Sequence, residues 1–143
     1  MKNEINNIIQ IESKIINQSE KLKARYGIKD LGLNMQDPKH MEYVFECNKI
    51  SEELSDYLET LSDDDLSQLV ALMYAGRDRL AFNKKDEFNQ YYESIKEQEF
   101  TNRNTCIRKI CEKEMSLSTY YSRALNMVHS LNFDVDTDFH KSK

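Results

Sequence analysis

The stretch LSDDDLSQLVALMYAGRD (residues 61–78) places charged side chains at both ends of an apolar run. At one end stand three carboxylates, Asp63, Asp64 and Asp65, which are the hard oxygen ligands that Ca²⁺ and Mg²⁺ prefer. At the other end, Arg77 offers a planar fork for a carboxylate or a phosphate, and Asp78 follows it as a base or ligand. Metal binding and anion binding are the two kinds of chemistry that these residues can support.

The three acids also fit the start of a helix. Ser62 predicts the N-cap, and Asp65, at the third helical position, can return a bond to the Ser62 N–H in a capping box. Asp63 and Asp64 then face the positive end of the helix dipole. Because a helix start accounts for all three acids, we expect no metal site here.

Gly76 predicts the end of the same helix, since glycine readily adopts the left-handed conformation that closes many helices. A helix end does not require the two charges that follow it. We therefore expect Arg77 to form an ion pair that joins neighbouring helices, with an acid in residues 38–61 as its partner.

The rest of the sequence offers little for catalysis. The tail segment DVDTD (residues 134–138) resembles the opening of a calcium loop, but Phe139 stands where that loop needs glycine. The three histidines and three cysteines follow no ligand spacing, and three glycines cannot build a phosphate-binding loop. We predict no catalytic, cofactor-binding or metal-binding residue and expect a protein that is not an enzyme.

The elements that position these residues are expected to be helices. Only 3 glycines and 1 proline stand among 143 residues, too few to separate the many short strands of a sandwich or barrel. We predict an all-α fold in a single domain, residues 1–143, forming one compact bundle of about five to six helices. Apolar spacing and caps predict helices over 3–26 and 38–61, one between the Ser62 cap and Gly76, one over 83–98, one capped by Thr101 and one capped by Ser116 or Ser118.

Other segments leave alternatives open. Residues 3–26 pack an isoleucine-rich stripe either into the core or against a second copy in a homodimer, and their polar residues face solvent. Asp37 and Pro38 start the next helix, in which Met41 and Phe45 continue the apolar period, and Ser51 can break it. Residues 28–37 are a linker, 38–132 a helical core and 133–143 a frayed tail, although Phe133 and Phe139 could dock.

The net charge of −5 opposes direct nucleic-acid binding, which needs a basic surface. The N-terminal residues lack the apolar core of a signal peptide and the roughly 20 apolar residues of a membrane span. Three cysteines, an odd number, favour a reducing compartment. We expect a cytoplasmic protein without membrane contact.

Acidic residues concentrate in residues 51–66, which contain seven acids and no basic residue. In one interpretation these acids pair with basic residues after position 100 or simply face solvent. In the other they form a binding surface that imitates phosphate or docks on a basic groove.

Tyrosine is also unusually frequent, with eight residues that include two adjacent pairs, Tyr91–Tyr92 and Tyr120–Tyr121. One tyrosine of each pair can be buried while the other lies near the surface. The candidate interaction residues are Glu52, Glu53, Asp56, Asp63, Asp64, Asp65, Tyr91, Tyr92, Tyr120 and Tyr121.

A motif in this region resembles an uncharacterised bacterial and phage family known only as a domain of unknown function. Its core reads L-x-A-L-M/W-x-x-G-R-D/G, and the similarity extends over residues 57–128. The resemblance implies a small helical domain that shares a Gly-Arg-Asp corner, and Arg79 departs from the glycine or acid that often follows. The matching residues are Leu61, Asp64, Asp65, Leu69, Val70, Ala71, Leu72, Met73, Gly76, Arg77 and Asp78.

Our leading hypothesis is a non-enzymatic helical interaction protein, encoded by a phage or mobile element, that binds another protein through an acidic, tyrosine-bearing face. A nucleic-acid-handling complex is one such partner, which the acids would inhibit by competing with phosphate. The alternative is a small-ligand binder or enzyme with its site at the Gly76-Arg77-Asp78 corner. The least favoured hypothesis is a DNA-binding regulator that uses Arg103, Arg108 and Lys109.

Overall fold

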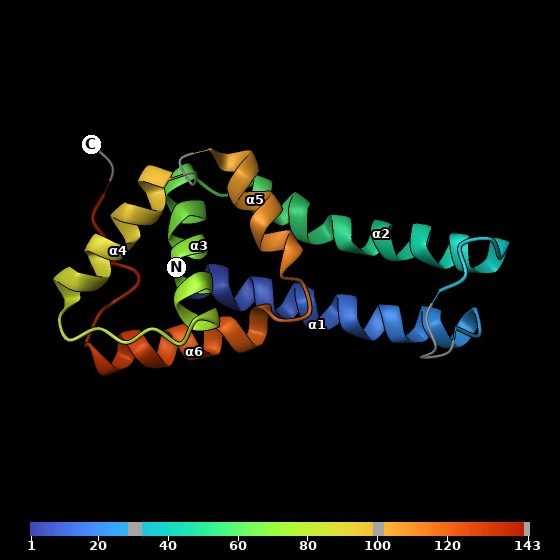
Figure 1. Ribbon diagram of the computed structural model, residues 1–143, viewed down its shortest axis with the longest axis horizontal. Helices are drawn as coiled ribbons and strands as arrows, with labels where there is room; N and C mark the ends of the chain where they lie inside the picture. Colours follow the sequence, from blue (N-terminus) through green and yellow to red (C-terminus); the bar gives the residue numbers. More distant parts are fainter. Residues whose placement is uncertain (29–32, 99–101, 142–143) are drawn as a thin grey trace.

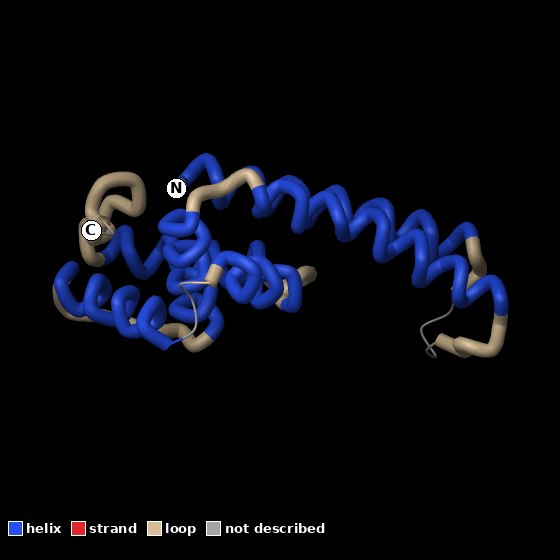
Figure 2. The backbone as a smooth tube through the Cα atoms, turned by 90° about the horizontal axis from the view of Figure 1, so that it is seen from above, coloured by secondary structure: helices blue, strands red, loops and turns tan. Residues whose placement is uncertain are grey.

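The computed structural model describes residues 1–28, 33–98 and 102–141, and all regular structure in these ranges is helical (Figures 1 and 2). The all-α prediction is confirmed. The helices are α1 (Lys2–Arg25), α2 (Pro38–Glu59), α3 (Asp63–Arg77), α4 (Lys85–Gln98), α5 (Arg103–Glu112) and α6 (Leu117–Ser130). Thr101 and linker residues 29–32 lie outside the described residues. The Asn102 side chain caps α5 by accepting bonds from the Asn104 and Thr105 N–H groups, at 2.9 and 3.2 Å.

Helix α2 is continuous, so the predicted alternative of a break at Ser51 is wrong. The Asp37 carboxylate caps the helix by accepting a bond from the Lys39 N–H at 2.9 Å, and Pro38 fills the first position, as predicted. The Ser51 hydroxyl does not start a new helix. It donates to the Glu114 carboxylate at 3.0 Å, which ties α2 to the connection after α5.

Helix α3 is the centre of the bundle and contacts α4, α5 and α6. Figure 1 shows it crossing between the other helices. A helix that buries residues around most of its circumference must be enclosed by other elements. Its buried residues are Leu66, Ser67, Leu69, Val70, Ala71, Leu72, Met73, Ala75 and Gly76.

Gly76 lies inside α3, so the prediction that it ends the helix in a left-handed turn is wrong. A Cβ atom at this position would stand 1.8 Å from the carbonyl oxygen of Tyr120 in α6. The helix ends at Arg77, and the residue with positive φ is Arg79, at 53°. Glycine is needed here because two helix backbones meet, a use of glycine that a helix-end pattern does not reveal.

A second contact joins α1 to α6 through Glu12. Ser116 is the N-cap residue of α6, as predicted, but its side chain forms no cap bond. The Glu12 carboxylate accepts bonds instead from the Leu117 and Ser118 N–H groups, at 2.8 and 3.0 Å. Glu12 is only 2% exposed, so the prediction that the polar residues of this helix face solvent is wrong for Glu12. Charge-assisted bonds at a helix N-terminus offset the cost of burying a carboxylate.

The segment after α6 is docked on α4, which corrects the prediction of a frayed tail. Phe133, Val135 and Phe139 are buried. The rings of Phe133 and Phe139 contact Phe88, with centroids 4.9 and 5.5 Å away. The Asn89 amide donates to the Asp138 carbonyl at 2.8 Å and accepts from the His140 N–H at 3.0 Å. Apolar and polar contacts together hold the tail, in agreement with the alternative that Phe133 and Phe139 dock.

The C-terminal half of α1 and the N-terminal half of α2 form an arm that extends away from the other helices (Figures 1 and 2). The two helices of the arm run side by side and contact each other (Figures 1 and 2). Near the tip, the Tyr26 hydroxyl donates to the Glu46 carboxylate at 2.9 Å, and the Tyr26 and Tyr43 rings meet edge to face at 6.4 Å. The bundle is therefore compact at one end and reduced to two helices at the other.

We expect Gly76→Ala to destabilise the protein. Alanine favours helix by about 1 kcal/mol over glycine, but forcing apart the α3 and α6 backbones should reverse this and cost about 2 kcal/mol net. Thermal unfolding measures the loss. Gly27→Ala is the control, because its Cβ meets no atom within 4 Å and only its φ of 65° opposes the change, by about 1 kcal/mol. A loss at Gly76 no larger than at Gly27 would contradict the assignment.

We expect Glu12→Ala to cost about 3 kcal/mol of unfolding free energy, because it leaves two N–H groups of α6 without their acceptor. Urea unfolding measures this cost. Glu20→Ala, on the exposed side of the same helix, should change the free energy by less than about 0.5 kcal/mol. Equal effects of the two changes would show that Glu12 does not cap α6.

Candidate functional site

The Gly-Arg-Asp corner stands at the C-terminal end of α3. The Arg77 Nε and Nη2 atoms donate to the two carboxylate oxygens of Asp78, at 2.9 and 3.2 Å. The Arg77 guanidinium also covers the Tyr74 ring, with its carbon 4.4 Å from the ring centroid. Arg77 is therefore held by two neighbours from its own end of the helix, one through charge and one through a cation–π contact.

The expectation that Arg77 pairs with an acid in residues 38–61 is wrong. Helix α2 ends close to the start of α3, and Arg77 follows Asp63 by fourteen residues, a rise of about 20 Å along the helix. The hydrogen bonds between the two side chains raise the pKa of Arg77 and lower that of Asp78. Both side chains are thus charged at neutral pH, in an exposed pair rather than a buried one.

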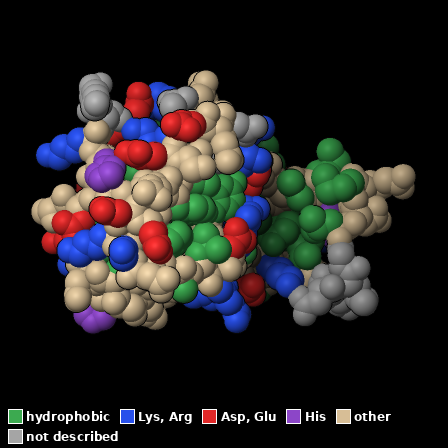
Figure 3. All heavy atoms as spheres, turned by 60° about the vertical axis from the view of Figure 1, so that its left-hand side comes forward, with side chains coloured by type: hydrophobic (Ala, Val, Ile, Leu, Met, Phe, Trp, Pro, Cys, Tyr) green, Lys and Arg blue, Asp and Glu red, His purple; other side chains and the backbone are tan. Residues whose placement is uncertain are grey.

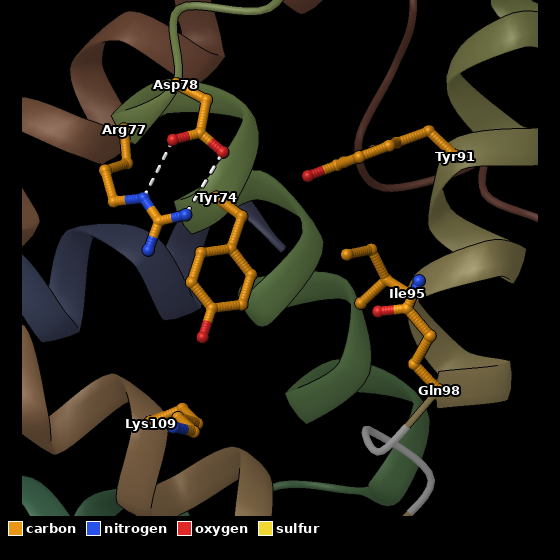
Figure 4. Close-up of a pocket in the computed structure, with 7 residues that line it drawn as sticks. All are labelled: Tyr74, Arg77, Asp78, Tyr91, Ile95, Gln98 and Lys109. Carbon is orange, nitrogen blue, oxygen red and sulfur yellow. Dashed lines mark hydrogen bonds and ion pairs between the residues drawn. The ribbon is translucent and has the colours of Figure 1, made fainter.

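A cavity of about 630 Å³ lies beside this pair. Three helices line it, and Figure 4 shows their side chains around one space. Helix α3 contributes Tyr74 and Arg77, with Asp78 directly after it; α4 contributes Tyr91, Ile95 and Gln98; α5 contributes Lys109. The corner that the sequence singled out is therefore one wall of a cavity, and the other walls come from residues that are distant in the sequence.

Tyr91 is the predicted interaction residue that the structure brings to this cavity. Its hydroxyl points toward the Arg77–Asp78 pair (Figure 4). Burial, with a smaller contribution from the Asp78 charge, raises the pKa of Tyr91 to about 12. The hydroxyl therefore remains protonated at neutral pH and can act as a hydrogen-bond donor.

The other predicted tyrosines lie elsewhere. Tyr92 and Tyr121 are fully buried, and the Tyr121 hydroxyl donates to the Leu69 carbonyl at 3.1 Å. Neither can serve as an interface anchor. Tyr120 is half-buried, and its carbonyl meets Gly76. The prediction that one tyrosine of each pair is buried is confirmed.

Several predicted acids pair within the fold. Arg103 contacts the Asp63 carboxylate at 2.6 Å and donates to the carbonyl oxygens of Glu59 and Leu61, at 3.0 and 3.2 Å. Further ion pairs join Lys96 to Asp64 at 3.5 Å and Lys14 to Glu53 at 3.1 Å. These contacts support the interpretation in which acidic and basic elements pair across the fold.

The Ser62 cap is formed as predicted, but the reciprocal bond of a capping box, from the Ser62 N–H to the Asp65 carboxylate, is not found between these two described residues. The Ser62 hydroxyl accepts a bond from the Asp65 N–H at 3.1 Å, and Asp63, Asp64 and Asp65 occupy the first turn of α3. The three aspartates therefore have structural roles at the start of a buried helix. Two of them also carry the contacts to Arg103 and Lys96.

Two predicted acids, Glu52 and Asp56, belong to a different surface. They lie on the face of α2 that points away from α1, in register with exposed residues spaced three, four and seven apart. We call this face the outer stripe: Met41, Phe45, Asn48, Glu52, Asp56 and Glu59. It is apolar near the tip of the arm and acidic toward the bundle.

The sequence interpretation missed this surface because it assigned Met41 and Phe45 to the buried side of the helix. They are 54% and 60% exposed. Among the described residues, five large apolar side chains are exposed. Four of them lie at or near the tip of the arm, at the start of α2 and just before it: Leu33, Met35, Met41 and Phe45. Figure 3 shows apolar side chains gathered on the arm. Plotting α2 with Leu54 and Leu58 facing inward places Met41 and Phe45 on the opposite side, a signal present in the sequence.

Within the described ranges, no group of three or more His, Cys, Asp or Glu side chains could hold a metal ion. Cys106 and Cys111 are poor nucleophiles, because burial raises the pKa of each thiol to about 11 and disfavours the thiolate. The arrangement at the corner is instead suited to binding, with cationic, aromatic and amide groups around one space.

The pKa of Tyr91 predicts a measurable pH dependence. The unfolded chain releases the tyrosine proton near pH 10 and the folded protein near pH 12, so Tyr91 stabilises the fold below about pH 10 and loses that contribution as pH rises toward 12. We expect the unfolding free energy of Tyr91→Phe to fall less steeply over this interval than that of the unmodified protein. Urea unfolding at several pH values measures both slopes, and identical slopes would contradict the assignment.

Comparisons with protein-family models, curated proteins and solved structures give no match to this chain. The resemblance over residues 57–128 therefore stays a prediction. In the described part of the chain, each helix is too short or too polar to cross a membrane.

Proposed function

We propose that this chain is a non-enzymatic interaction protein that binds a protein partner along the outer stripe of α2. The observation that carries the proposal is the exposure of Met41 and Phe45 on a face that no other described helix covers. Exposed apolar side chains gathered in one place mark a contact surface more often than isolated ones do. Leu33 and Met35, beside the start of α2, enlarge the apolar part.

The acidic end of the stripe supports a partner of opposite charge. No ion pair among the described residues engages Glu52 or Asp56, whereas Glu59, the last acid of the stripe, contacts Arg103 at 3.7 Å. Glu53, Asp63 and Asp64 are also paired with cations. An amphipathic partner helix with apolar anchors and adjacent lysines or arginines complements this surface, since its anchors would cover Phe45 and its basic residues would face the carboxylates. Nucleic-acid-handling proteins carry basic surfaces of this kind, and we propose them as the partner class.

Compared with the sequence-based hypothesis, the proposal keeps Glu52 and Asp56 and replaces the tyrosines with Met41 and Phe45 as anchors. The change follows from position, because the incompletely buried members of the two pairs lie away from the outer stripe: Tyr91 lines the cavity between α3, α4 and α5, and Tyr120 packs against α3 at Gly76. It also follows from pairing, because the acids at the start of α3 contact Arg103 and Lys96.

Affinity capture with the full chain as bait, followed by mass spectrometry, tests the proposal. We expect Met41→Ser to reduce recovery of the partner about tenfold, as for an interface anchor. Met115→Ser is the matched control, because Met115 is also 54% exposed but lies between α5 and α6. Glu52→Gln should weaken capture mainly at low salt, since exposed charges are screened as salt rises.

Two results would overturn the proposal. One is equal recovery with Met41→Ser and Met115→Ser. The other is self-association of the purified chain that Phe45→Ser abolishes, because the occupant of the stripe would then be a second copy. Sedimentation of the bait alone measures that self-association.

A further inference from the structure

We propose that the cavity between α3, α4 and α5 binds a small organic anion in which an oxyanion group is attached to a flat ring. The helices that line it, α3, α4 and α5, lie in the bundle, away from the tip of the arm (Figure 1), so this site is separate from the outer stripe. Its volume of about 630 Å³ falls within the roughly 300–1,000 Å³ of small-molecule sites.

The charge of the lining favours an anion. Two cationic groups, Arg77 and Lys109, face one carboxylate, Asp78, so the cavity is positive in a chain whose net charge is −5. Such a reversal of local charge attracts oxyanions in preference to cations.

Arg77 has a donor left for a ligand. Asp78 holds its Nε and Nη2 atoms, and the remaining guanidinium nitrogen points away from Asp78 (Figure 4). Asp78 thereby fixes the plane of the guanidinium before a ligand arrives, which lowers the entropic cost of binding.

Lys109 can supply the second cationic contact. Its Nζ atom lies 3.6 Å from the Glu112 carboxylate, one turn further along α5. An exposed pair of this spacing contributes little free energy and can be exchanged for a ligand contact. The site therefore combines one oriented cation with one adaptable cation.

The remaining walls fit a flat ring. The Tyr74 and Tyr91 rings and the Ile95 side chain supply aromatic and aliphatic surface, and the Gln98 amide can donate to or accept from polar ring substituents. The Tyr91 hydroxyl points toward the Arg77–Asp78 pair and can donate to an oxyanion bound there (Figure 4). An inorganic anion would use the cations but leave these surfaces uncovered.

Amide NMR titration of the full chain tests the site with three probes: phenyl phosphate, benzoate and inorganic phosphate. We expect saturable shifts at Tyr74, Tyr91, Gln98 and Lys109 with the two ring-bearing probes, at concentrations about tenfold lower than for inorganic phosphate. Tighter binding of phenyl phosphate than of benzoate assigns a phosphate as the oxyanion, and the reverse order assigns a carboxylate.

Arg77→Gln and Lys109→Met should each raise the dissociation constant of the tighter probe about tenfold, the usual effect of losing one charge-assisted bond. Arg108→Gln is the matched control, because Arg108 is exposed beside Lys109 and does not line the cavity. Melting temperatures of all three variants show whether the fold is intact. Lys109→Met also tests the site without altering the Arg77–Asp78 ion pair at the end of α3.

Absence of saturable shifts, or equal affinity for inorganic phosphate and both ring-bearing probes, would overturn the proposal. Equal weakening by the Arg108 change would do so too, since it would indicate general charge attraction. Met41→Ser, which tests the outer stripe, should leave probe binding unchanged, so the two proposals can fail separately.

Discussion

The close contact of α3 with α6 at Gly76 is the constraint on which the rest of the fold depends. Helix α3 buries side chains around most of its circumference, and its neighbours must surround it at short range. At Gly76 a Cβ atom would meet the Tyr120 carbonyl, so the two backbones pack directly against each other. With α6 in this position, the Glu12 carboxylate can reach the first turn of α6, and α1 joins the same core.

The candidate surfaces follow from this arrangement. Because α3 is covered by α4, α5 and α6, its last turn emerges where α4 and α5 leave a space, and Arg77 lines that space. Helices α1 and α2 are longer than the others and extend past the bundle, so part of α2 has α1 on one side and solvent on the other. A cavity and an exposed helix face thus arise from one packing scheme with helices of unequal length.

Patterns local in the sequence predicted the fold well. The Asp37 and Ser62 caps, the proline at the start of α2 and the apolar spacing each depend on a few adjacent residues, and each is found in the structure. The failures involve partners far apart in the sequence. Glu12 is separated from Leu117 by 105 positions, and Gly76 is required by its close contact with the Tyr120 carbonyl of another helix. No spacing rule identifies such contacts.

The candidate site was predicted only in part, for the same reason. The Arg77–Asp78 corner stood out because its charges exceed what a helix end needs, but Lys109 and Gln98 join it only through packing of three helices. Met41 and Phe45 were misassigned because a helix of 22 residues can carry apolar residues on two sides, and an average period conceals the second. A projection of α2 alone separates the two sides.

The continuity of α1 has a mechanical consequence. Its 24 residues form a rod of about 36 Å that begins in the bundle and ends at the tip of the arm, and Glu12 lies near its middle. A force applied at the tip therefore acts on a stiff lever whose bundle half is held by buried isoleucines and by the bonds from Glu12 to α6. Load on the arm passes directly into the first turn of α6.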